Sequence, residues 1–208
     1  MELLARLLGG NERVKIMRFF LHHEDIILSL QEVSKKTKSK EAVVRKELNA
    51  LTAMGFIEKR KARMAITTSS GKKIFSKVKE VSGYALNPNF PHNDALKDLL
   101  FDFHLFDKKK LATLFKPVGR IKLFIVSGIF LGQAKTRVDI LLVGEAIKQE
   151  KAEKILDTLS AELGREVICS IMDVEEYEYR YKMYDKFVLD ILSMPHEKVI
   201  DKVQERLL

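Results

Sequence analysis

The chain has little of what marks a secreted, membrane or disulfide-linked protein. It contains one cysteine and no tryptophan among 208 residues. One cysteine cannot form an internal disulfide, and Cys169, within the apolar run VICSIM, is expected to be a buried and unreactive thiol. No run of about 18 apolar residues is present, so we expect no membrane-spanning helix and no membrane partner. The opening MELLARLLGG lacks the longer apolar segment of a signal peptide, and a cytoplasmic location is expected.

Signatures of several enzyme classes are also missing. The sequence has no P-loop, no dinucleotide-binding fingerprint and no nucleophile elbow. Its five histidines lack the spacing and the neighbouring cysteines of a zinc site. We therefore expect no metal and no cofactor. Internal repeats and low-complexity segments are absent as well.

Positive charge is concentrated in the first part of the chain. Residues 1–80 carry 18 Lys/Arg against 9 Asp/Glu, a net charge of +9, whereas residues 81–208 carry 19 against 20. The asymmetry predicts that only the first part meets a polyanion. Solubility alone is the alternative explanation, because charge does not identify a partner.

Residues 39–54, SKEAVVRKELNALTAM, have the periodicity of an amphipathic helix. Val44, Leu48 and Leu51 fall on one face together with Gly55, which predicts a buried side. The opposite face is small, polar and positive. It is formed by Ser39, Ala42, Lys46 and Asn49.

Two shorter helices are predicted ahead of this one, and a hairpin after it. Residues 11–22 are predicted to form a helix with Asn11 as its N-cap. Ser29 and Glu32 have the spacing of a capping box and predict the start of a second helix. After the third helix, FIEKRKARMAI is expected to be a strand, TTSSG a tip, and IFSKVKEVSGYAL the returning strand, with an extra helical turn inside it. This order is that of a winged helix-turn-helix with a long wing.

The winged-helix interpretation assigns DNA contacts to one set of residues. On the third helix, Ser39, Ala42, Lys46 and Asn49 would face base edges, and Lys40 and Arg45 would face phosphates. In the wing, the DNA backbone or minor groove would be met by Lys59, Arg60, Lys61, Arg63, Lys72 and Lys73.

The two prolines Pro88 and Pro91 mark a domain linker, since they interrupt both helices and strands. We expect a DNA-binding domain at residues 1–90, connecting helices at 91–118 and a second domain at 119–208.

The second domain is predicted to contain three strands and a helix. The strands are RIKLFIVSG, VDILLVG and EVICSIM, and the helix is QEKAEKILDTLSAELG, which predicts an α/β sheet with covering helices. Its end is expected to be helical, with Asp173 as an N-cap and Pro195 opening the last helix. Its four tyrosines suggest either a dimer contact or a packed face.

The segment SGIFLGQAKTRVDILLVG resembles the core of the minimal nucleotidyltransferase fold. That family has a Gly-Ser after its first strand, a loop glycine, and an Asp-x-Asp pair that holds Mg²⁺ at the start of its second strand. Ser127 and Gly128 match the Gly-Ser in reversed order and Gly132 matches the loop glycine. Asp139 matches the second aspartate, but Arg137 replaces the first. The resemblance therefore implies a vestigial nucleotide site, and an ion pair between Arg137 and Asp139 across the strand would explain both residues equally well.

Over its full length the chain resembles prokaryotic predicted transcriptional regulators that join a winged helix to a degenerate nucleotidyltransferase-like domain. The resemblance implies a double-stranded DNA-binding regulator, not an enzyme, that forms a homodimer. The second domain would serve dimerisation, protein docking or the sensing of a nucleotide or small-molecule effector. The alternatives are an active nucleotidyltransferase targeted by its winged helix, and an antitoxin-like partner protein.

Overall fold

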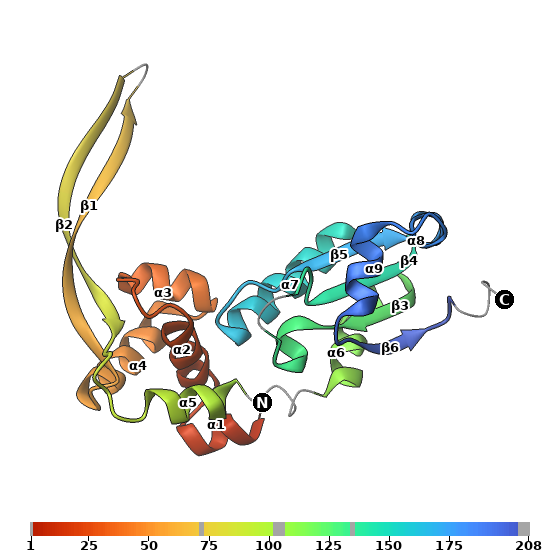
Figure 1. Cartoon of the computed structure of the whole chain (residues 1–208). Coiled ribbons are helices and arrows are strands. Elements are labelled where there is room, and N and C mark those ends of the chain that lie inside the picture. Colours follow the sequence, from red (N-terminus) through yellow and green to blue (C-terminus); the bar gives the residue numbers. More distant parts are fainter. Residues whose placement is uncertain (1, 71–72, 102–106, 134–135, 204–208) are drawn as a thin grey trace. The chain divides into compact units, whose positions relative to one another are not determined.

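The computed structural model describes residues 2–70, 73–101, 107–133 and 136–203 (Figure 1). The fold is mixed α and β, with helices and two separate sheets. The chain divides into two compact units, one of residues 2–100 with 161–165, the other of residues 101–160 with 166–208. The division along the chain lies between residues 100 and 101. It therefore follows the next helix rather than coinciding with the Pro88 and Pro91 segment.

The first unit contains five helices among its described residues. They are α1 (Glu2–Leu8), α2 (Asn11–His22), α3 (Leu30–Thr37), α4 (Glu41–Ala53) and α5 (Asn93–Leu100). The capping box of Ser29 and Glu32 is confirmed at the start of α3. The expected N-cap of α2 is wrong, because Gly10 holds that position and Asn11 is the first helical residue.

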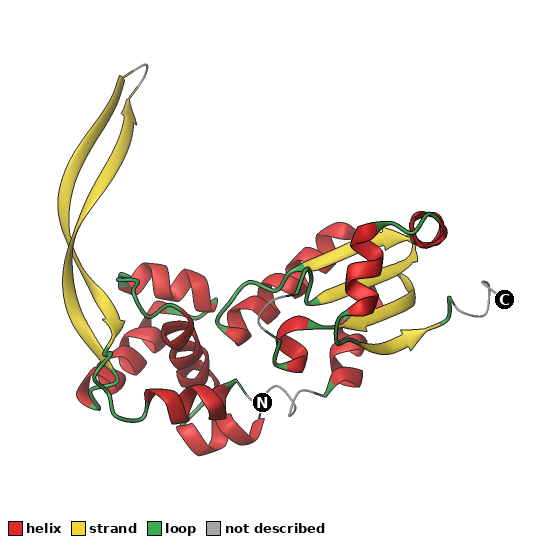
Figure 2. Ribbon diagram, in the orientation of Figure 1, coloured by secondary structure: helices red, strands yellow, loops and turns green. Residues whose placement is uncertain are grey.

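Two strands of the first unit form a ribbon (Figure 2). β1 (Ile57–Ser70) pairs antiparallel with β2 (Lys73–Leu86), from Ile57 opposite Leu86 to Ser70 opposite Lys73. The predicted long hairpin is thus present, but its strands extend further than expected, since Ser70 and the threonines before it belong to β1. The extra helical turn predicted in the returning strand is wrong, because β2 is unbroken.

The segment after β2 packs on its own unit, which explains why the two prolines do not separate the units. The side-chain amide of Asn87 donates to the Gly55 carbonyl at 2.8 Å, and that of Asn93 donates to the Asn87 carbonyl at 2.9 Å. The ring of Phe90 meets buried Phe56 edge to face. These contacts connect α5 to the ribbon base.

The second unit is built on one mixed sheet. Its strands β3 (Arg120–Val126), β4 (Ile140–Glu145), β5 (Cys169–Asp173) and β6 (Glu197–Asp201) stand in the order β5-β4-β3-β6. β4 and β5 are parallel, and both pairings of β3 are antiparallel. The helical elements are α6 (Lys108–Leu114), η2 (Lys116–Val118), η3 (Gly128–Leu131), α7 (Gln149–Leu163), α8 (Val174–Lys182) and α9 (Lys186–Ser193), of which α7 has its last three residues in the first unit.

Helices α8 and α9 cover one face of this sheet. Tyr177, Val188 and Ile191 share a buried cluster with Leu123 and Leu141 of the two central strands. The opposite face of β3 presents Phe124, whose ring lies 5.3 Å from that of Phe115. Both faces of the central strands are thus buried, in keeping with their nearly continuous apolar sequence.

The prediction of a final helix opened by Pro195 is wrong. Residues Glu197–Asp201 form β6, which pairs with β3 from Val126 opposite Glu197 to Leu123 opposite Asp201. The β-branched Val199 and Ile200 favour a strand, and the free edge of β3 offers hydrogen-bond partners that a helix would not use. None of the described helices combines the length and apolar character needed to cross a bilayer.

Candidate functional site

Helix α4 buries the face that its periodicity predicts. Val44 and Leu48 are fully buried and Leu51 is 1% exposed. The exposed residues of the outward side are Glu41, Ala42, Val43, Arg45, Lys46 and Asn49, and the N-cap Lys40 ahead of them is exposed as well. Within the described part of the chain, the side chains of Arg45, Lys46 and Asn49 form no ion pair or hydrogen bond with other residues. Their polar ends are therefore available to a ligand.

Two contacts from α2 fix the position of α4. The guanidinium of Arg13 donates to the Glu47 carboxylate over 2.6 Å, and Glu47 is buried despite its charge. Ser39 precedes α4 and does not lie on its outward face. It is half-buried, and its hydroxyl hydrogen bonds to the Glu12 carboxylate. Sequence periodicity thus assigned Ser39 to a helix that begins only at Glu41.

Exposed lysines on α3 extend the positive surface. Lys35 and Lys36 occupy the last turn of α3 and are exposed. Lys38 follows as the C-cap in a left-handed conformation, with φ of 50°. These residues were not among the predicted contacts, although the basic run KKTKSK in the sequence is a signal that could have found them.

A short bridge ties the ribbon to the helices. Leu28, between α2 and α3, exchanges two backbone hydrogen bonds with Tyr84 of β2, at 3.0 and 2.8 Å. Gly83 permits this approach, because a Cβ at that position would lie 2.7 Å from the Leu28 carbonyl oxygen. The ribbon base is therefore held against the α2–α3 connection.

The cations at the ribbon base differ in their surroundings. Lys59 is exposed and its ammonium lies 5.9 Å from the centre of the Tyr84 ring, while Lys61, two residue pairs further along the ribbon, is also exposed. Arg60 pairs with Glu58, with Nη2 to Oε1 at 2.5 Å, which offsets part of its charge. Of the remaining predicted contacts, Lys72 and the side chains of Arg63 and Lys73 lie outside the described residues.

The four residues of the predicted vestigial site do not form one cluster. Asp139 is 2% exposed, and its carboxylate accepts the backbone amides of Ile129 at 3.0 Å and Ile168 at 2.9 Å. Gly128 has a φ of 54°, and a Cβ there would lie 2.1 Å from Asp139 Oδ1. Ser127 is buried beside them and its hydroxyl donates to the Pro195 carbonyl at 3.2 Å. These three residues therefore form a closed turn stabilised by the carboxylate.

Arg137 points elsewhere. Its Nε lies 2.6 Å from Asp190 Oδ2 on α9, so the predicted pairing of Arg137 with Asp139 is wrong. Asp139 lies just before β4, and its two oxygens are engaged by backbone donors instead. The loop glycine Gly132 ends η3 in a left-handed conformation with φ of 68°.

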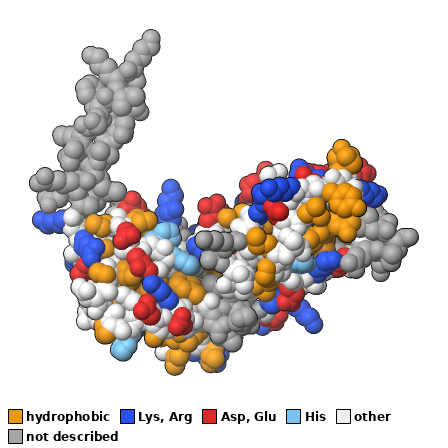
Figure 3. All heavy atoms as spheres, viewed as in Figure 1, with side chains coloured by type: hydrophobic (Ala, Val, Ile, Leu, Met, Phe, Trp, Pro, Cys, Tyr) orange, Lys and Arg blue, Asp and Glu red, His pale blue; other side chains and the backbone are white. Residues whose placement is uncertain are grey.

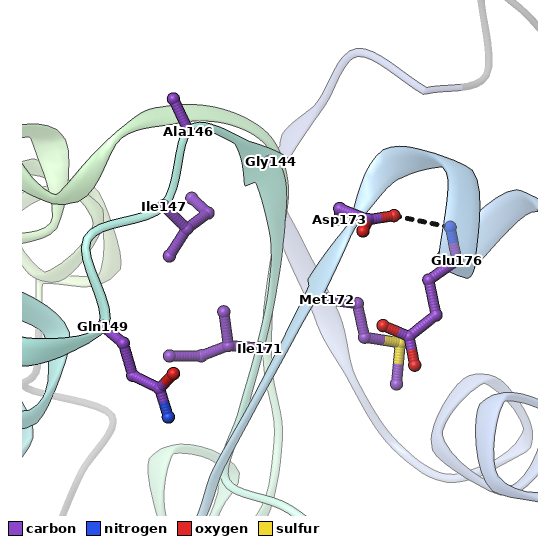
Figure 4. A pocket seen from close by; sticks show the side chains of 8 residues that line it. All are labelled: Gly144, Ala146, Ile147, Gln149, Ile171, Met172, Asp173 and Glu176. Atoms are coloured by element: carbon purple, nitrogen blue, oxygen red, sulfur yellow. Dashed lines mark hydrogen bonds between the residues drawn. The ribbon is translucent and has the colours of Figure 1, made fainter.

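Two open pockets adjoin the outer strand β5. One, of about 240 Å³, lies between the start of α7 and the start of α8 and is lined by Gln149, Ile171, Asp173 and Glu176 among others (Figure 4). Asp173 accepts the Glu176 amide at 2.7 Å as the predicted N-cap. The second, of about 300 Å³, is lined by acidic residues of α7 and by Cys169. Neither pocket takes in Ser127, Gly128, Arg137 or Asp139.

Cys169 is a weak nucleophile in these surroundings. Burial, followed by the negative charge of Asp139, raises the pKa of its thiol to about 12. The thiolate is the reactive form, so the residue is expected to be inert at neutral pH. Among the described residues, no group of three or more His, Cys, Asp or Glu side chains is arranged to hold a metal ion.

Comparison of the chain with protein-family models, curated proteins and solved structures finds no match.

Proposed function

We propose that the chain is a sequence-specific DNA-binding transcriptional regulator whose first unit is a winged helix-turn-helix. The observation that carries the proposal is the outward face of α4, where Arg45, Lys46 and Asn49 are exposed without intramolecular partners beside the small Ala42. A helix with a small, polar and positive face can enter the major groove and present donors to base edges.

The order of elements supports this proposal. Three helices, α2 to α4, are followed by a two-stranded ribbon. The backbone bridge from Leu28 to Tyr84 pairs the connection between α2 and α3 with the returning strand β2. In this arrangement α4 is the recognition helix and the ribbon is the wing. The ribbon is long for a wing, and its base carries exposed Lys59 and Lys61.

Each residue has a proposed role. Ala42, Lys46 and Asn49 face base edges, and Lys40, Arg45, Lys35 and Lys36 contact phosphates. Lys59 and Lys61 extend the phosphate contacts along the wing. Arg60 contributes less to phosphate binding, because its charge is partly offset by Glu58. Ser39, held by Glu12, orients α4 instead of reading a base.

We infer that the second unit does not transfer nucleotides. Metal-dependent transfer needs a carboxylate oxygen that can bind a cation, but both Asp139 oxygens accept backbone amides. The cation Arg137, which stands where the first metal ligand would be, pairs with Asp190. Incubation with labelled ATP and Mg²⁺ or Mn²⁺ tests this inference, and label transfer to any acceptor would contradict it.

Fluorescence anisotropy is the direct test of DNA binding. The purified chain is titrated onto a duplex from upstream of its own gene and onto a scrambled duplex of equal length, at low salt and near physiological salt. We expect both affinities to fall with salt, because phosphate contacts release counterions, and the upstream duplex to remain bound when the scrambled one is released. Equal release of both duplexes would reduce the proposal to general polyanion binding. No binding of either duplex would reject it.

A further inference from the structure

Helix α8 carries an exposed apolar surface at its C-terminal end. Tyr179 is 66% exposed, Met183 63% and Tyr184 79%. Figure 3 shows hydrophobic side chains gathered over this helix. The opposite side of α8 is buried through Val174 and Tyr177, which pack on the sheet. The exposed residues therefore add nothing to the core of their own unit.

Charged residues flank this surface with opposite signs. At 3.6 residues per turn, Glu175, Glu178, Tyr179, Lys182 and Met183 fall on one side of α8, which we call the α8 face. Its acidic residues lie toward the N-terminus and Lys182 lies toward the C-terminus. In the described part of the chain, Glu175, Glu178 and Lys182 form no ion pair, whereas neighbouring Arg180 pairs with Glu176 and Asp185.

This polarity makes the α8 face complementary to itself. When two copies of α8 lie antiparallel about a twofold axis, the acidic end of each meets the basic end of the other. The midpoint between Glu175 and Lys182 falls between Glu178 and Tyr179, so alignment of these opposite charges sets Tyr179 of each copy opposite Glu178 of the other, next to the axis. The two Glu178 carboxylates also lie there, so the complementarity depends on the two Glu175–Lys182 pairs, which offset the repulsion between the Glu178 side chains. A parallel arrangement would instead oppose like charges.

The exposed area is of the size needed for a modest dimer. Tyr179 and Met183 present on the order of 250 Å² per copy. Two copies would then bury about 500 Å² from these residues, and the three charged side chains of the face bring the total toward about 1,000 Å², the size of a weak or transient interface.

We propose that the α8 face is the contact between two copies of this chain, paired antiparallel across a twofold axis with Tyr179 next to that axis and Glu175 opposite Lys182 of the partner. The inference deepens the proposed function. Only the role of the dimer, which is to bind paired half-sites on DNA, rests on that proposed function. An interface of this size belongs to the weak or transient class, and we expect a dissociation constant in the micromolar range.

Sedimentation velocity of the full chain without DNA, from about 1 to 100 μM, tests the proposal. We expect a reversible dimer that the double variant Y179A/M183A weakens by about tenfold or more, because large side chains at an interface centre contribute most to binding. The single variant K182E should also weaken the dimer, since it places like charges together.

The charge reversal E175K/K182E separates pairing from a general loss of structure. Both charges change sign in both copies, so the proposed ion pairs are restored and the dimer should return to within about threefold of the original affinity. K154E on exposed α7 is the matched control and should change nothing. Thermal melting of each variant verifies that the second unit remains folded.

Three results would overturn the proposal. They are a monomer at every concentration, a dimer indifferent to Y179A/M183A and K182E, and a double reversal no better than K182E alone. A monomer would mean that a different protein covers the α8 face or that it stays exposed. A dimer that does not bind DNA would contradict the proposed function but not this inference. A monomer that binds DNA would contradict this inference but not the proposed function.

Discussion

Arg13 on α2 and Glu47 on α4 form an ion pair in which Nε lies 2.6 Å from Oε2. The Glu47 side chain is 10% exposed, so its carboxylate has given up most of its water and depends on the guanidinium. The pair links the helix that presents Arg45, Lys46 and Asn49 to the centre of its unit. The orientation of the outward face of α4 therefore depends on a polar contact as well as on packing.

Replacing Arg13 with methionine should lower the free energy of unfolding by about 2 kcal/mol, because the Glu47 carboxylate is left buried without its donor. Urea unfolding followed by circular dichroism measures the change. The double variant R13M/E47L should recover part of the loss, since it removes the unpaired charge as well. A single variant as stable as the original chain would show that water satisfies Glu47.

The variant R45A/K46A should keep the fold and lose specific DNA binding. Arg45 and Lys46 are exposed and contribute no described intramolecular contact, so melting should be unchanged. Each lost phosphate contact reduces the slope of log affinity against log salt by about 0.9. Anisotropy on the upstream duplex measures both quantities, with K151A/K154A on α7 as the matched control. Undiminished binding would place the DNA contact elsewhere.

Local sequence patterns predicted most of the secondary structure. Helix α2 and the capped start of α3 follow directly from residue spacing, and the buried face of α4 from its period of 3.6. The apolar runs of β3, β4 and β5 were equally clear. The residues that determine each of these elements lie within one short segment, so each element can be predicted without knowledge of distant contacts.

The errors concern residues whose state is set by distant partners. β6 forms because the edge of β3 is free, which the segment around Val199 does not reveal. Arg137 pairs with Asp190, and Ser39 with Glu12, across separations in sequence that periodicity cannot connect. The candidate DNA-binding face was therefore predictable in part, whereas the arrangement around Asp139 was not.

Asp139 should prove to be a structural residue. Asparagine offers only one acceptor oxygen, so D139N leaves one of the Ile129 and Ile168 amides facing another donor and should cost about 1–3 kcal/mol of stability. R137Q, which breaks a surface ion pair, should cost less than about 1 kcal/mol. Urea unfolding of both variants gives the comparison. A D139N variant as stable as R137Q would contradict the assignment and reopen Asp139 as a ligand-binding residue.

Cys169 is half-buried near Asp139, and the reactivity of its thiol gives a test that depends on pH. The pKa of its thiol is raised from 9.0 to about 12, so the folded chain disfavours the thiolate. At pH 9 roughly half of the thiols in the unfolded chain are ionised, against about one in a thousand in the folded chain. Iodoacetamide alkylation followed by mass spectrometry should therefore be at least about a hundredfold slower in buffer than in urea. As pH rises from about 9 toward about 12 the unfolded state releases this proton first, so stability should fall. Equal alkylation rates would show that Cys169 is open to solvent.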